Sequence, residues 1–155
     1  MSFMDGNAAF TLVILIVLIS FSAFFSATET AYTSLNKVRL KNMANSGNRK
    51  AAKILALSEN YDRLISTILI GNNIVNILST SLATAMFVRM LGDSGVTVST
   101  VVMTMVILLF GEVAPKSLAR ISNEKIAFAG YPLLTFIVKV FTPLSFLMGC
   151  WQKLM

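Results

Sequence analysis

The chain has 155 residues, of which 55% are hydrophobic and only 13% are charged, and its formal net charge is +6. Soluble domains carry about 25% charged residues, so this composition indicates one domain whose surface largely faces lipid. The absence of histidine and the single cysteine exclude histidine-ligated zinc, a Ser-His-Asp triad and an internal disulfide framework.

The first apolar run begins near Ala8 and weakens toward Leu35. It is long enough to cross a bilayer and too long for the apolar part of a cleavable signal peptide. We therefore predict a retained transmembrane helix over residues 8–35.

A polar and basic segment follows, with seven of the thirteen Lys and Arg residues between Lys37 and Arg63. Interspersed apolar residues and a break near Asn45-Ser46-Gly47 predict short amphipathic helices over residues 37–58. Grouped positive charge marks a cytoplasmic loop next to a lipid surface, and the aromatic residues of a nucleic-acid binder are missing from it.

Two further apolar runs predict transmembrane helices over residues 62–91 and 96–114, separated by a turn at residues 92–95. Gly111 and Pro115 predict that the third helix is broken near its end. With the basic loop inside, the N-terminus lies outside and the C-terminus is cytoplasmic.

The last segment, residues 124–153, is less regular because it contains Pro132, Lys139 and Pro143. We favour a kinked juxtamembrane helix that lies along the inner interface, although its hydropathy also permits a fourth span. The predicted fold is thus an all-α integral membrane domain of the plasma membrane, with three transmembrane helices.

Three polar clusters lie inside the apolar runs, where polar groups are costly and often functional. In the first, Ser22, Ser26, Glu29 and Thr33 share one helical face. The alternative for its hydroxyls is a hydrogen bond to the carbonyl one turn earlier. That alternative does not explain Glu29.

The second cluster contains Asn72, Asn73 and Asn76, whose spacing makes one helical face rich in carboxamides. The alternative is hydrogen bonding between membrane helices. In the third cluster Glu112 comes after a long apolar run and is flanked by Gly111 and Pro115. Its alternative is an ion pair between Glu112 and Lys116, four residues apart.

By helical rise, all three clusters fall in the inner half of a bilayer core about 30 Å thick. They offer carboxylate, carboxamide, hydroxyl and backbone carbonyl oxygens, which suit Mg²⁺, Ca²⁺ or Na⁺ and not soft metals. The residue types alone do not choose among these three cations.

The same clusters carry a family resemblance, in the strings FFSATETA (24–31), IGNN (70–73) and LFGEVAPK (109–116). Together and in this order they resemble the transmembrane domain of the CorC/cyclin-M magnesium transporters. The resemblance implies a homodimer that exports Mg²⁺, coupled to Na⁺ entry, through an inward-facing site. Family members usually continue into cytoplasmic CBS modules, so we expect any ATP dependence to reside outside this chain.

The resemblance also implies roles for individual residues. The expected Mg²⁺ ligands are Ser22 or Ser26, Asn72 or Asn73, and Glu112, together with backbone carbonyls near Gly111. Candidates for Na⁺ binding or gating are Glu29, Thr33, Asn76, Pro115 and Lys116, and Gly130 and Pro132 would form the kink of the juxtamembrane helix.

The leading functional prediction is therefore secondary magnesium transport. A magnesium-sensing or regulatory subunit without transport would use the same site. A purely structural protein would use the asparagines only to join helices. An intramembrane enzyme is disfavoured, because there is no histidine and no Ser–Lys pair at matched depth.

Overall fold

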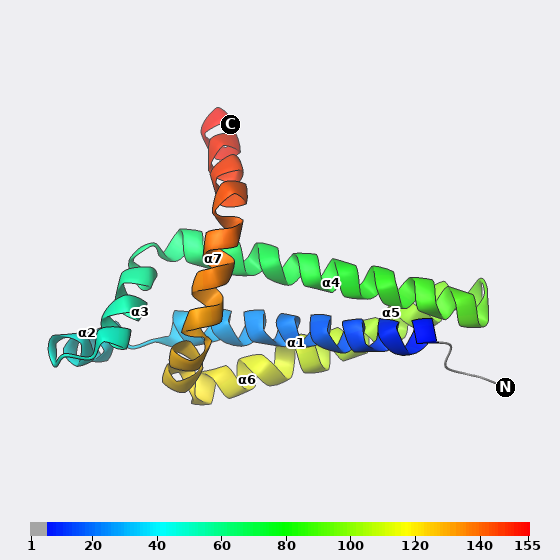
Figure 1. The fold of residues 1–155 in the computed structure, drawn as a ribbon, viewed down its shortest axis with the longest axis horizontal. Helices are drawn as coiled ribbons and strands as arrows, with labels where there is room; N and C mark the ends of the chain where they lie inside the picture. Colours follow the sequence, from blue (N-terminus) through cyan, green and yellow to red (C-terminus); the bar gives the residue numbers. More distant parts are fainter. Residues whose placement is uncertain (1–5) are drawn as a thin grey trace.

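The computed structural model describes residues 6–155, leaving out the side chains of Ser145 and Gln152. Within this range the chain forms helices joined by short connections, without a strand (Figure 1). The helices are α1 (Gly6–Ser34), α2 (Lys37–Asn45), α3 (Arg49–Glu59), α4 (Tyr61–Leu91), α5 (Ser94–Val106), the π-helix η1 (Ile107–Val113), α6 (Ala114–Ile121) and α7 (Asn123–Leu154).

Three long helical segments run side by side: α1, α4, and the continuous stretch from α5 through η1 to α6 (Figure 1). Helix α7 crosses them steeply in the same view. Four segments of the described chain are long and apolar enough to span a membrane, and one of them is Asn123–Leu144 of α7. Length and hydropathy therefore support an all-helical membrane domain, but they do not by themselves establish the predicted count of three spans.

The basic loop folds into α2 and α3, as the sequence predicts. Asn36 and Asn48 precede the two helices, and their side chains accept hydrogen bonds from the backbone N–H of Arg39 and Ala51, at 3.1 and 3.0 Å. Such caps satisfy N–H groups that a helix start leaves open. Gly47 lies between the helices with φ = 96°, a conformation that favours glycine, and so sets the predicted break.

The turn between α4 and α5 brings these two helices unusually close. A Cβ atom built on Gly95 would lie 2.5 Å from the backbone carbonyl carbon and oxygen of Phe87. Glycine is therefore required here for close packing, and α5 can return along α4 directly after the turn.

The third helix is disturbed where the sequence predicts a break, but it does not break. The chain does not leave the helix at Gly111 or Pro115; it widens into η1 and then continues as α6. Pro115 lies in the first turn of α6, where a missing N–H is tolerated. The extra residue per turn in η1 absorbs the disturbance that the proline would cause in a regular α-helix.

Two apolar clusters hold the helices together. The larger joins α1, α2, α3, α4, α6 and α7, and includes Phe25, Ile54, Leu64 and Leu134. The smaller joins α1, α4 and α5 through Leu15, Ala83 and Met103. Ser22 of α1 and the three asparagines of α4 fall between the buried residues of these two cores, whereas Ser26, Glu29 and Thr33 lie along the stretch of α1 that belongs to the larger one.

Candidate functional site

A buried hydrogen bond between α1 and α4 forms the centre of the candidate site. The Ser22 hydroxyl donates to Oδ1 of Asn72 at 3.0 Å. Ser22 is fully buried and Asn72 is 8% exposed. The Ser22 hydroxyl therefore bonds to another helix and not to a carbonyl of its own helix. Thr28 shows the contrasting case, because its hydroxyl donates to the carbonyl of Phe24 one turn earlier.

The π-helix η1 brings a third segment to the same point. A Cβ atom on Gly111 would lie 2.9 Å from Oγ of Ser22, so only glycine lets η1 approach this closely. Pro115 has no N–H, and its usual acceptor would be the carbonyl of Gly111 in an α-helix or of Phe110 in a π-helix. A main-chain oxygen of η1, at Gly111 or Phe110, therefore loses one ordinary donor. We call the meeting point of Ser22, Asn72 and Gly111 the polar junction.

Two further oxygen atoms near the polar junction are buried without a hydrogen-bond partner among the described residues. Oγ of Ser26 lies one turn after Ser22, and Oδ1 of Asn76 lies one turn after Asn72. Buried polar atoms are nearly always paired, because an unpaired one costs about 1–3 kcal/mol. The two oxygens are thus available to a ligand.

The acidic residues near the polar junction do not form the ion pair between Glu112 and Lys116 that their spacing in the sequence allows. Lys116 pairs with Glu29 of α1, with Nζ and Oε2 separated by 3.8 Å, and not with Glu112. Glu112 is half-buried and, within the described chain, has no ion pair. Its carboxylate is therefore not neutralised by a basic side chain, while Glu29 and Lys116 connect α1 to α6.

Other predicted residues lie outside the polar junction. The side chain of Asn73 is exposed on α4. Thr33 is exposed too, and its hydroxyl donates to the carbonyls of Glu29 and Thr30. Gly130 of α7 packs against the ring of Phe24, to which a Cβ atom would come within 3.1 Å. Helix α7 continues through Pro132, so the kink at these positions stays a prediction.

Sequence reasoning missed the contact that sets the distance between α1 and α4. The ring of Phe25 covers Gly71, where a Cβ atom would lie 2.6 Å from the ring. This places α4 close enough for Asn72 to reach Ser22. The signal was available, because Gly71 directly precedes the asparagines and glycine in a membrane helix often marks close packing.

The polar junction therefore offers hard oxygen atoms from three helical segments. Among the described residues no three of His, Cys, Asp and Glu gather to form a conventional metal cluster. The arrangement suits a ligand held by neutral oxygens with one carboxylate nearby, such as a hydrated or partly dehydrated hard cation.

Comparison with known proteins gives consistent matches. The model of the cyclin M transmembrane N-terminal domain (CNNM) matches residues 13–154. A UPF0053 protein of Haemophilus influenzae is 42% identical over 97% of this chain and 36% of its own length. The UPF0053 inner membrane protein YfjD of Escherichia coli is 42% identical over 86% of the chain and 31% of its own length.

A more distant relative is named polyamine export protein, from Escherichia coli, at 27% identity over 86% of this chain and 33% of its own length. The chain thus spans about a third of the length of these three curated relatives. The matched family is a membrane domain and not an enzyme class. Because its model covers nearly all of the apolar helices and the whole polar junction, the chain belongs to the cyclin M (CNNM) transmembrane domain family of multi-pass membrane proteins.

Proposed function

We propose that this domain binds Mg²⁺ at the polar junction and moves it across the plasma membrane. The observation that carries the proposal is the convergence of Ser22, Asn72 and Gly111, with two unpaired buried oxygens beside them. Family membership supports membrane transport, and the donor types favour a hard cation.

The hydrogen bond at the polar junction leaves lone pairs for an ion. Ser22 uses its proton to reach Asn72, so both lone pairs of the hydroxyl oxygen and one of Oδ1 stay available. Small rotations would bring in Ser26, and the carbonyl of Gly111 could complete the set. Glu112, one residue further, would supply the negative charge, which outweighs several neutral dipoles in a low dielectric.

The proposed topology has three spans, formed by α1, α4 and the stretch from α5 to α6. Support comes from α7, which crosses these helices (Figure 1), so that it cannot stand upright in the membrane together with them. Helix α7 would then lie along the cytoplasmic face beside the basic helices α2 and α3, with the N-terminus outside. We further propose a homodimer in which Na⁺ entry drives Mg²⁺ export.

The test is isothermal titration of the purified protein with Mg²⁺, with and without Na⁺. Glu112→Gln keeps the size of the side chain but removes its charge, and we expect Mg²⁺ affinity to fall at least about tenfold, since charge-assisted contacts contribute about 1.5–3 kcal/mol. Glu29→Gln is the matched control and should change affinity less, because Glu29 already pairs with Lys116. Equal affinity in wild type and Glu112→Gln would contradict the assignment.

Flux separates transport from sensing. Proteoliposomes that contain only this protein should move Mg²⁺, and an imposed Na⁺ gradient should change the rate. Saturable Mg²⁺ binding without any flux would instead identify a magnesium-sensing subunit.

Polyamine export is the second candidate, because two relatives carry that name at 26% and 27% identity. A polyamine presents several ammonium groups and needs several acceptors of negative charge. Near the polar junction the described acidic residues are Glu112 and the already paired Glu29, which fits a compact cation better. Spermidine that displaces Mg²⁺ at equal concentration, or that is transported faster, would favour this candidate.

A further inference from the structure

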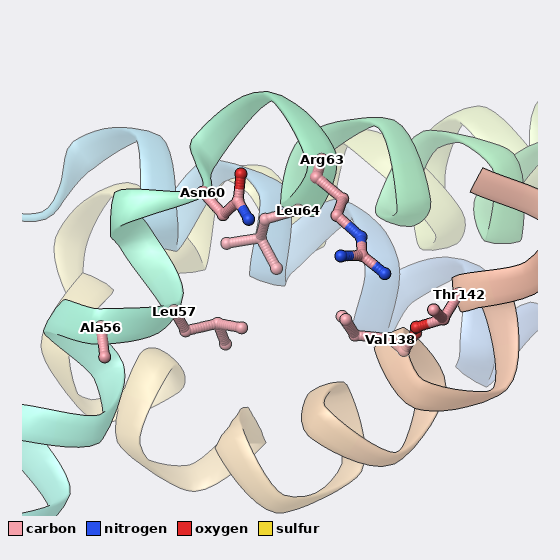
Figure 2. Close-up of a pocket in the computed structure, with 7 residues that line it drawn as sticks. All are labelled: Ala56, Leu57, Asn60, Arg63, Leu64, Val138 and Thr142. Carbon is pink, nitrogen blue, oxygen red and sulfur yellow. The ribbon is translucent and has the colours of Figure 1, made fainter. Parts of the chain in front are cut away.

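A cavity of about 290 Å³ lies where α3, the beginning of α4 and the middle of α7 meet. It shares no residue with the polar junction. It is lined by Ala56, Leu57, Asn60, Arg63, Leu64, Val138 and Thr142 (Figure 2). The guanidinium of Arg63 extends from α4 toward Val138 and Thr142 of α7 in this view. The cavity is thus a mainly apolar hollow with one cation directed into it.

Two exposed polar side chains, those of Asn60 and Arg63, line this cavity as hydrogen-bond donors. The ion pairs among the described residues are Arg39–Glu124 and Glu29–Lys116, so Arg63 has no carboxylate partner there. The side chain of Asn60 makes no capping hydrogen bond to α4, and its NH2 group is a hydrogen-bond donor at the rim of the cavity. Thr142 already donates to the carbonyl of Val138 at 2.7 Å. Arg63 and Asn60 are therefore the donors, and an anion fits them.

The position of the cavity indicates where such an anion would come from. Arg63 lies in the first turn of α4, which under the proposed topology is the level at which the second span leaves the cytoplasmic headgroup region. The planar fork of arginine matches the oxygens of a phosphate group. Basic pockets between helices on the cytoplasmic side are a known means of holding lipid headgroups.

Helix α3, which forms one wall, carries three basic residues against the single acidic Glu59, and Asp62 follows in α4, so the surroundings keep a net positive charge. An inorganic anion would leave the apolar part of the cavity unused, whereas a lipid would fill both parts. The combination of an unpaired guanidinium, an amide donor and an apolar wall at headgroup depth therefore favours a molecule with a phosphate and an acyl chain.

We propose that this cavity holds an anionic phospholipid, with the phosphate on Arg63 and Asn60 and an acyl chain along Leu57, Leu64 and Val138. The lipid would join α3, α4 and α7, and so fix the juxtamembrane helix against the second span. The inference rests on the proposed membrane topology and not on the identity of the transported ion.

The test compares three probes on the purified protein in detergent: phosphatidylglycerol, phosphatidylcholine and inorganic phosphate. Native mass spectrometry measures the bound lipid. Wild type should bind phosphatidylglycerol at least about tenfold more tightly than phosphatidylcholine, as expected for a charge-assisted contact. Arg63→Gln should abolish this preference, whereas Arg89→Gln, an exposed arginine near the other end of α4, should keep it.

A second variant tests the apolar part of the cavity. Ala56 is exposed on α3, so Ala56→Trp fills the hollow without disturbing the core or the charge, and should lower phosphatidylglycerol binding while Mg²⁺ titration stays unchanged. Equal binding of the two lipids, or a preference that survives Arg63→Gln, would overturn the proposal. Inorganic phosphate competing as well as phosphatidylglycerol would reduce the cavity to a simple anion site and would also contradict it.

Discussion

Two contacts in the described part of this domain join neighbouring helices by a hydrogen bond between two side chains, and they differ in which nearby polar atoms stay unpaired. At the first, Thr84 of α4 meets Ser99 of α5, with 3.0 Å between the hydroxyl oxygens. Thr84 also lies within hydrogen-bond distance of the carbonyl of Thr80. At the second, Ser22 meets Asn72 in the polar junction, and Ser26 and Asn76 nearby keep unpaired oxygens.

The surroundings of the two contacts differ as well. The contact between Thr84 and Ser99 lies between regular α-helices. The contact between Ser22 and Asn72 lies against η1, a π-helix, and π-helical turns are frequent at functional sites. A polar contact that serves only packing is satisfied by its neighbours, whereas one that serves a ligand keeps acceptors free. Substitutions that affect binding but not stability, or the reverse, can test this distinction.

The largest difference in Mg²⁺ affinity is expected between substitutions of two adjacent asparagines. Asn72→Ala removes an oxygen from the polar junction, so Mg²⁺ affinity should fall about tenfold, equivalent to about 1.4 kcal/mol. Asn73→Ala removes the same group from an exposed position and should leave affinity nearly unchanged. Titration of both variants measures the difference. Equal losses in the two would show that the buried position of Asn72 is not what matters.

A smaller effect is expected from crowding the polar junction without removing a ligand. Gly111→Ala places a methyl group 2.9 Å from Oγ of Ser22 and should lower Mg²⁺ affinity severalfold by displacing that oxygen. Gly149→Ala, at a helical glycine with open space around it, is the control and should have no such effect. Unchanged affinity in Gly111→Ala would mean that Ser22 is not a ligand.

The smallest effect is expected at the contact between α4 and α5. Ser99→Ala removes a buried hydroxyl, while Thr84 keeps the carbonyl of Thr80. The free energy of unfolding should fall by about 0.5–1 kcal/mol, as for other hydrogen bonds between membrane helices. Thermal unfolding in detergent measures the loss, and Mg²⁺ titration should show no change. A fall in affinity similar to that of Asn72→Ala would remove the distinction between the two contacts.

Much of the fold follows from local sequence. The helices of the basic loop, their separation at Gly47 and the turn after Leu91 were predictable, because caps, glycine and apolar run length act over a few residues. The continuation of the third helix through η1 was not. Gly111 and Pro115 signal a disturbance, but neighbouring helices decide whether the chain breaks or widens.

The candidate site was predictable as a set of residue types and only partly as a set of contacts. Periodicity placed Asn72, Asn73 and Asn76 on one broad face of a helix, without distinguishing the buried Asn72 from the exposed Asn73. Periodicity also allowed an ion pair between Lys116 and Glu112, whereas in the folded chain Lys116 pairs with Glu29. A spacing of four residues makes an ion pair within one helix possible, but a carboxylate on a neighbouring helix can lie closer to the lysine.

By itself the sequence determined that this is a helical membrane domain with oxygen-rich clusters inside its apolar runs, because run length and polarity are properties of short segments. Only the tertiary structure decided which oxygens face one another, since that depends on the rotation of each helix and on how closely the backbones approach. Phe25 over Gly71, and Gly111 beside Ser22, set those distances. The polar junction therefore exists only once α1, α4 and η1 have packed together.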